Sequence, residues 1–317
     1  MKKVLSLLLV LFFAASLAAE EESKVSFTPD MRLIFQYGLD MDSKDHLFNL
    51  ERAYIGLKAK LDNVSFRITG DVKYDSNTDI KDIYLKYAYA EVDKLIPMSK
   101  FIFGQQKTGL IDFEQDSIWG HRDVAKVPVD AYGLDTSADM GLAIDMKLPN
   151  KLGGLHLGYF AGEGYKKETV EGGEEKAVSL RAKLNLGPLM VTVYGKIKGM
   201  PAGADSQTLF GAIVSFKNDM ISAALQFFMN DTGTTEQVIA AYATFHAIPK
   251  KLDIFARFDM NDPNTDVDNE ADEGSHLYLG LKYFLASKTS VAAFFKSYMP
   301  SVGDNANSIN FSFDQKF

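Results

Sequence analysis

The chain has 317 residues, of which 46% are hydrophobic and 24% are charged, with a formal net charge of −8 and no cysteine. This balance excludes a disordered polymer and an all-apolar helical membrane bundle. The lack of cysteine excludes a disulfide scaffold, a thiolate zinc site and a catalytic cysteine. The acidic charge argues against a nucleic-acid-binding protein, which usually carries a basic balance.

The N-terminus has the layout of a secretory signal peptide. A basic start at Lys2 and Lys3 is followed by an apolar run, and small residues precede Ala19. The apolar run is too short to cross a bilayer as a helix, so a signal peptide over 1–19, cleaved after Ala18 or Ala19, is predicted in preference to a buried N-terminal helix. We expect an exported protein with one domain over 20–317.

Beyond this segment, apolar and polar residues alternate with period two. Val64, Phe66 and Ile68 alternate with polar side chains, for example, and the last segment places Phe311, Phe313 and Phe317 on one face. This period predicts strands rather than helices. We expect an all-β chain of about sixteen strands, each long enough to cross a membrane when tilted. They are predicted near 28–38, 47–61, 64–74, 80–91, 98–106, 137–148, 154–161, 175–186, 189–199, 206–217, 219–230, 235–246, 251–260, 274–285, 288–298 and 307–317.

The connections between these segments alternate between short turns and long polar loops. This sorting predicts a transmembrane antiparallel up-and-down β-barrel, with short periplasmic turns and long extracellular loops. A soluble β-sandwich has no reason to sort its loops in this way. The apolar faces are expected to meet lipid and the polar faces to line water. The terminal Phe317 also resembles the C-terminal signal that the outer-membrane assembly machinery reads, which predicts the outer membrane as the location.

Four segments resemble the phosphate-selective porins O and P. They are Phe48-Asn49-Leu50-Glu51-Arg52-Ala53-Tyr54-Ile55-Gly56, Gly70-Asp71-Val72, Lys81-Asp82-Ile83-Tyr84-Leu85-Lys86-Tyr87 and Phe103-Gly104-Gln105-Gln106-Lys107. The resemblance implies a sixteen-stranded homotrimeric porin. It also implies that the third extracellular loop, 107–136, folds inward and narrows the pore.

On the predicted polar faces, cations outnumber carboxylates although the whole chain is acidic. The expected pore-lining cations of the wall are Arg52, Arg67, Lys73, Lys86, Arg181 and Arg257. A basic wall in a narrow channel attracts anions, so a modest anion preference, including phosphate, is predicted. The partners would be small ions and solutes, the lipid bilayer and lipopolysaccharide.

Loop 107–136 carries charges of both signs. His121, Arg122 and Lys126 are expected to line the constriction, together with Asp112 and Glu114, and Trp119 to anchor the loop to the wall. The loop carboxylates either face the passage or bind the wall. If they face it, a nonselective or cation-preferring porin results. A plugged structural or adhesive barrel is the alternative from another class.

One acidic loop has the spacing of a calcium-binding loop. Its oxygen-bearing residues are Asp262, Asn264, Asp266, Asp268 and Glu273. The alternatives are a solvated acidic loop or one bridged to lipopolysaccharide by divalent ions. The histidines have no zinc-site spacing, and no G-x-S-x-G or phosphate-binding loop occurs. We therefore expect no enzyme and no cofactor other than this calcium ion. An outer-membrane esterase or phospholipase barrel is the enzymatic alternative, for which no Ser–His pair can be named.

Overall fold

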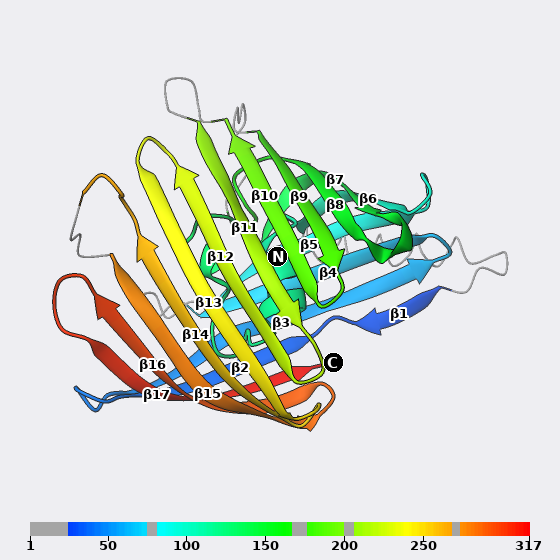
Figure 1. The fold of residues 1–317 in the computed structure, drawn as a ribbon. Helices are drawn as coiled ribbons and strands as arrows, with labels where there is room; N and C mark the ends of the chain where they lie inside the picture. Colours follow the sequence, from blue (N-terminus) through cyan, green and yellow to red (C-terminus); the bar gives the residue numbers. More distant parts are fainter. Residues whose placement is uncertain (1–24, 75–80, 167–175, 200–205, 268–272) are drawn as a thin grey trace.

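A single antiparallel sheet closes on itself in the computed structural model, which describes residues 25–74, 81–166, 176–199, 206–267 and 273–317. Strands β2 to β17 each pair with the next, and β17 pairs with β2, which gives a closed barrel of 16 strands (Figure 1). The predicted fold class and strand number are confirmed. The predicted signal peptide, 1–19, lies outside the described residues.

The strands have bounds close to those expected. They are β3 (His46–Leu61), β4 (Val64–Tyr74), β5 (Lys81–Asp93), β6 (Ser99–Lys107), β7 (Ala138–Lys147), β8 (Gly153–Phe160), β9 (Ala177–Leu186), β10 (Leu189–Lys198), β11 (Gln207–Lys217), β12 (Ile221–Asp231), β13 (Thr235–Ile248), β14 (Leu252–Asp262), β15 (Gly274–Ala286), β16 (Thr289–Pro300) and β17 (Ala306–Lys316).

The first predicted strand, 28–38, is wrong as a single element. It is divided into β1 (Ser26–Pro29) and β2 (Arg32–Asp40), which both pair with β3. The division falls at Asp30, whose carboxylate forms ion pairs with Lys58 on β3 and Arg67 on β4. These ion pairs hold the segment between β1 and β2 against the neighbouring strands.

Alternation along each strand separates an apolar outer surface from the barrel interior. On β10, for example, Val193 and Ile197 are 48% and 61% exposed, whereas Tyr194 and Lys196 are buried. Successive side chains of a strand point to opposite faces, so a period-two pattern places the large aliphatic and aromatic residues outside. In the described part of the chain, no helix is long and apolar enough to cross a membrane.

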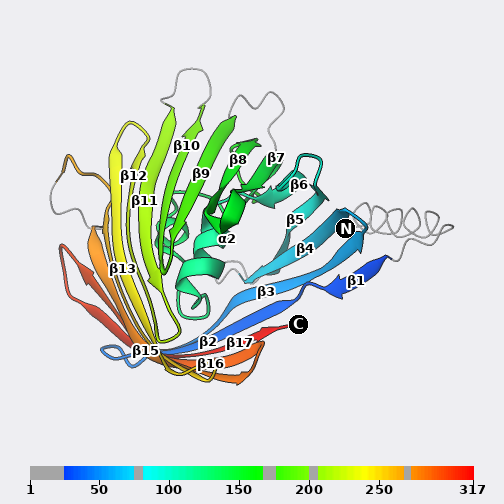
Figure 2. The same cartoon turned by 45° about the vertical axis from the view of Figure 1, so that its right-hand side comes forward.

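The barrel interior contains the long connection between β6 and β7. This segment, 108–137, is called the constriction loop below. It carries α2 (Ile111–Glu114), the π-helix η1 (Gln115–Trp119) and α3 (Pro128–Ala131), and it lies within the barrel in Figure 2. A further short helix, η2 (Pro149–Lys151), occupies a turn at the opposite rim. The expected inward position of the loop is thus observed.

The interior is not lined by polar side chains throughout, which corrects the sequence interpretation. The constriction loop buries an apolar cluster against the inner face of β10 to β16. Its loop members are Leu110, Ile111, Trp119, Val124, Val127, Val129 and Leu134, and its wall members include Tyr194, Leu209, Ile213, Phe228, Val238, Tyr242, Phe255 and Phe294. These wall residues break the expected alternation because they serve as the binding surface of the loop. The anchoring role expected for Trp119 is confirmed, since its side chain is buried in the cluster.

Candidate functional site

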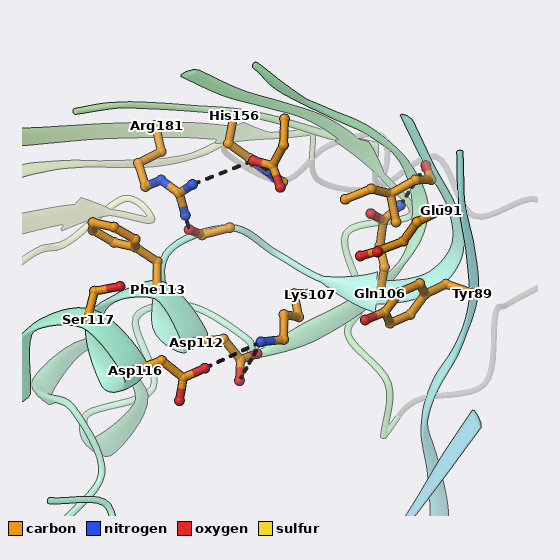
Figure 3. A pocket seen from close by; sticks show the side chains of 13 residues that line it. Tyr89, Glu91, Gln106, Lys107, Asp112, Phe113, Asp116, Ser117, His156 and Arg181 are labelled. Carbon is orange, nitrogen blue, oxygen red and sulfur yellow. Dashed lines mark hydrogen bonds and ion pairs between the residues drawn. The ribbon is translucent and has the colours of Figure 1, made fainter. Parts of the chain in front are cut away.

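The constriction loop divides the barrel interior into an apolar contact and a polar gap. The polar gap includes a cavity of about 230 Å³ between the loop and β5 to β9 (Figure 3). A second cavity, of about 260 Å³, lies against β9 to β12 near their short turns. Ser117 in the middle of η1 lines both cavities, so the two spaces adjoin along the same side of the loop. This side is the candidate functional site.

Two buried carboxylates attach the loop to the wall. Asp123 pairs with Lys282 at 2.5 Å and accepts a hydrogen bond from Ser312 at 3.1 Å. Asp135 pairs with Lys196 at 2.6 Å and accepts a hydrogen bond from the hydroxyl of Tyr194 at 2.8 Å. Loss of one partner from such a pair leaves a buried charge without compensation. The wall-binding interpretation of the loop carboxylates therefore applies to these two residues.

Arg257 attaches the middle of the loop. Its guanidinium pairs with Asp259 on the same strand and donates a hydrogen bond of 2.5 Å to the carbonyl of Lys126. The indole ring of Trp119 lies over it, with 5.2 Å between the guanidinium carbon and the ring centroid. Arg257 is 1% exposed. It was expected to line the pore, but the loop covers it.

The start of the loop rests on a cluster from β7, β8 and β9. Arg181 donates a hydrogen bond to the carbonyl of Gly109 and lies 4.2 Å from the centroid of Phe113. Asp145 lies 3.6 Å from this guanidinium and accepts a hydrogen bond of 2.9 Å from His156. Gly109 has a φ of +97°, and a β-carbon there would lie 2.7 Å from Nε2 of His156. Only glycine fits this point of the chain without displacement.

The wall opposite the apolar cluster carries cations stacked on tyrosine rings. The guanidinium of Arg52 lies 4.5 Å from the ring centroid of Tyr54, and that of Arg67 lies 4.0 Å from that of Tyr87. Such contacts stabilise a cation without neutralising its charge. Lys86 is buried and lies 3.9 Å from a carboxylate oxygen of Asp71.

Among the residues expected to line the constriction, Asp112 lines the main cavity. Arg52 and Lys126 are partly exposed. Asp112 accepts a hydrogen bond of 2.9 Å from Tyr87 and lies 3.8 Å from Lys107. Burial alone would raise the pKa of Asp112. The neighbouring cations, above all Lys107, nevertheless hold that pKa below its usual value. Asp112 is therefore a carboxylate at neutral pH.

Three other expected residues are placed away from water. His121 is 3% exposed, packs against Phe255 and hydrogen-bonds Thr244 at 3.0 Å. Burial holds the pKa of His121 well below its usual value, so the ring is neutral. Arg122 is buried and pairs with Glu51 at 3.5 Å.

Glu114 is the third of these residues and is fully buried in the wall contact. Its Oε1 is hydrogen-bonded to the hydroxyl of Tyr242, and its Oε2 has no partner among the described residues. Burial raises the pKa of Glu114 to about 7, and the hydrogen bond from Tyr242 opposes that shift only in part. The sequence could not show that Glu114, His121 and Arg122 are buried, because a loop with several short helices and turns has no regular period that separates buried from exposed positions.

The remaining expected residues are distributed as follows. Arg67 pairs with Asp30 at 2.6 Å, and Arg181 belongs to the cluster under Gly109. The side chain of Lys73 lies outside the part that the structure describes. Two residues that the sequence did not single out, Lys107 and Asp116, lie 3.5 Å apart at the main cavity. Their signal was weak because each is one charge among many in an acidic loop.

The proposed calcium loop is only partly described, since Asp268 lies outside the described residues. Oxygens of Asp262 and Asn264 accept hydrogen bonds from the backbone amides of Asn264 and Asp266, at 3.1 and 3.2 Å. Among the described residues, no group of three or more His, Cys, Asp or Glu side chains is placed to hold a metal ion. The calcium site stays a prediction.

Comparison with known proteins places this fold among outer-membrane barrels. The outer-membrane protein OmpT of Vibrio cholerae is similar with a TM-score of 0.68 and 15% identity, over 94% of this chain and 99% of that one. A trimer form of the same protein gives a TM-score of 0.65 at 16% identity, over 94% and 100% of the chains. A mutant of the Rh. blastica porin gives a TM-score of 0.60 at 12% identity, over 92% and 100%.

No family model matches this chain, and no curated protein matches its sequence. The likeness to solved structures shows the fold, which is a porin-like outer-membrane barrel. The broader part of the expected resemblance is thus confirmed. Its phosphate-selective branch stays a prediction.

Proposed function

We propose that the chain is an outer-membrane porin, a passive diffusion channel for small hydrophilic solutes with no catalytic step. The observation that supports this function most directly is the one-sided position of the constriction loop. The loop binds β10 to β16 through apolar residues and leaves a polar gap lined with charged groups against β5 to β9.

The charge preference proposed for this channel is weakly anionic. Most cations of the wall are neutralised by ion pairs, of which Arg32–Asp314, Arg67–Asp30, Lys196–Asp135, Arg257–Asp259 and Lys282–Asp123 are examples. Arg52, Lys183 and Lys296 make no direct ion pair with a carboxylate in the described part of the chain. These three charges support a small excess of positive potential. Phosphate would be one of several permeating anions, without a tight site.

Planar-bilayer recording of the purified protein tests this function. We expect stepwise conductance in KCl and, in a KCl gradient, a small reversal potential of the anion-selective sign. A potential of the cation-selective sign would overturn the anion preference. A protein that inserts but stays silent would instead indicate a plugged structural or adhesive barrel. Added phosphate should reduce chloride current only weakly.

We also propose that the protein works in the outer membrane as a homotrimer, exported with removal of residues 1–19. The trimer form reported for OmpT supports this assembly state by analogy. Contacts with lipopolysaccharide at the rim of long loops are part of the same proposal. Mass measurement of the detergent-solubilised protein gives the oligomeric state, and N-terminal sequencing of the mature chain gives the cleavage point.

A further inference from the structure

The main cavity contains a hydrogen-bond acceptor that the protein does not satisfy. The amide nitrogen of Gln106 donates to the carbonyls of Gly141 and Ile102, at 2.9 and 3.2 Å. These two bonds fix the orientation of the amide, because only its NH₂ group can donate to a carbonyl. The Oε1 atom of Gln106 consequently has no partner among the described residues, although the residue is 1% exposed and lines the cavity (Figure 3).

A second polar atom of the cavity lining belongs to His156. Its Nδ1 is 2.9 Å from Oδ1 of Asp145, and this carboxylate is also 3.6 Å from Arg181. The Nε2 atom has no partner in the described part of the molecule, and His156 is 2% exposed.

The charges that line the cavity are mainly negative. The carboxylates of Glu91, Asp112, Asp116 and Asp145 face Lys107 and Arg181 among the lining residues, and Glu91 is also paired with Lys100 at 2.7 Å. The side chain of Asp116 is 56% exposed and lies 3.5 Å from Lys107, so much of its hydrogen-bonding capacity is open. Tyr89 and Phe113 add aromatic surface to the same space.

We propose that this cavity binds the primary ammonium group of small organic cations. An ammonium group has three donors and no acceptor, which matches a cavity with an unsatisfied acceptor and a half-exposed carboxylate. Gln106 would accept a hydrogen bond from this group, the charge of Asp116 would attract it, and the alkyl part would lie against Phe113 and Ile102. A carboxylate group has no donor for Gln106 and is repelled by the acidic lining.

This site rests on the proposed channel function but makes a separate statement. Small inorganic ions respond to the summed potential of the whole lumen, in which Arg52, Lys183 and Lys296 make no direct ion pair with a described carboxylate. A shaped donor group responds to the acceptors within contact distance. A weak anion preference in KCl and a local ammonium site are therefore compatible.

The test uses n-butylammonium chloride as the probe and sodium butyrate as its matched anion. Isothermal titration calorimetry on the detergent-solubilised full chain should show saturable binding of butylammonium and none of butyrate. In planar bilayers, butylammonium should reduce KCl conductance in a saturable and voltage-dependent way. Because calorimetry does not require conduction, binding to a silent barrel would overturn the channel function and keep the site. Normal conductance without binding or block would overturn the site alone.

Two variants locate the binding. Asp116→Asn removes an exposed charge with little change of shape, and Gln106→Met removes the unsatisfied acceptor. Each should weaken butylammonium binding about tenfold, because each removes a partner of a charged donor. Asp62→Asn is the control, since it makes the same charge change as Asp116→Asn in the short turn after β3, and it should bind as the wild type does. Equal affinity in wild type, Asp116→Asn and Gln106→Met would overturn the proposal.

Discussion

At the scale of single residues, Glu114 is a fully buried carboxyl group between the constriction loop and the barrel wall. The Tyr242 hydroxyl lies within hydrogen-bond distance of Oε1 of Glu114 and of Oε1 of Gln226, the latter at 2.7 Å. The nearest cation, Arg257, is already paired with Asp259, and Asp130 adds a further negative charge nearby. Ionisation of Glu114 in place is therefore unfavourable, and the neutral acid is the form that suits the docked loop.

The resulting pH dependence has a definite sign. The pKa of Glu114 is raised from 4.5 in the unfolded reference to about 7 in the folded protein. Below pH 4.5 both states hold the proton, so docking is strongest. As the pH rises toward 7 the undocked state gains from ionisation, which weakens docking by on the order of 3 kcal/mol above pH 7.

Trp119 gives a direct measurement of this effect, because it is the only tryptophan of the chain and lies 5.4 Å from the ring of Tyr242. We expect acrylamide quenching of its fluorescence to increase between pH 5 and 8 in the wild type. In Glu114→Gln, which keeps the hydrogen bond to Tyr242, quenching should stay constant. Asp116→Asn, with an exposed carboxyl on the same loop, should behave as the wild type. Parallel curves for wild type and Glu114→Gln would contradict the assignment.

At the scale of elements, the constriction loop is held by a few buried ion pairs as well as by its apolar side. The pair between Asp123 and Lys282 joins the loop to β15, and Gln36 donates a hydrogen bond of 2.6 Å to the carbonyl of Asp123 from β2. Strand β15 is part of the wall that carries the apolar cluster, and β2 lies beyond β16 and β17 in the sheet order. They fix both the position and the orientation of the loop.

Breaking this pair from one side should release the loop more than removing both charges. In Lys282→Met, the carboxylate of Asp123 stays buried without its cation, which costs about 3–5 kcal/mol of docking free energy. The double variant Lys282→Met/Asp123→Asn should recover most of this loss. Acrylamide quenching of Trp119 at increasing urea gives the docking free energy of each variant. A double variant as weak as the single one would show that the charge is not the cause.

The start of the loop depends on Gly109, where a β-carbon would collide with His156 and the φ is +97°. Gly109→Ala should displace α2 and change the single-channel conductance while the barrel stays folded. Gly187→Ala is the matched control, because Gly187 also has a positive φ, of +65°, but lies in a short turn with no atom near the added carbon. It should keep the wild-type conductance. Equal conductance in wild type and Gly109→Ala would show that the start of the loop does not control the width of the passage.

At the scale of the whole molecule, the outer surface is an apolar belt that suits a bilayer. Leu180, Val193, Phe210, Val214 and Leu225 are each between 47% and 58% exposed on adjacent strands. Such a surface is unfavourable in water and favourable against lipid. Because β17 pairs with β2, the described sheet closes and β2 to β17 leave no free edge strand to face the lipid.

Charge placed on this belt should cost free energy according to its depth. Val193→Arg, at the middle of β10, is expected to destabilise the inserted barrel by about 2–4 kcal/mol. Leu189→Arg lies on the same face at the end of the same strand and should cost only about 0–1 kcal/mol. Urea unfolding from lipid vesicles measures both values. Equal costs would show that β10 does not cross the apolar layer as proposed.

The strands could be predicted because their signal is local. In β10, successive side chains face alternately outside and inside the barrel, and regular pairing with β11 keeps this alternation along the strand. The division between β1 and β2 could not be predicted, since Asp30 turns inward to meet Lys58 and Arg67, which follow in the sequence only after a further strand has begun. The loop residues were the least predictable because their partners come from strands far along the chain.

Alternation along the strands was enough to predict a closed barrel with an apolar exterior, because a period of two places most apolar side chains of a strand on one face. The inward position of the constriction loop was expected only from the resemblance to the phosphate-selective porins. Which charges remain available in the lumen depends on contacts formed in the folded barrel. Asp123 and Asp135 neutralise Lys282 and Lys196 across large separations in sequence, whereas Arg52 keeps its charge on a tyrosine ring. Pairing of this kind depends on distances in space, which alternation along a strand does not encode.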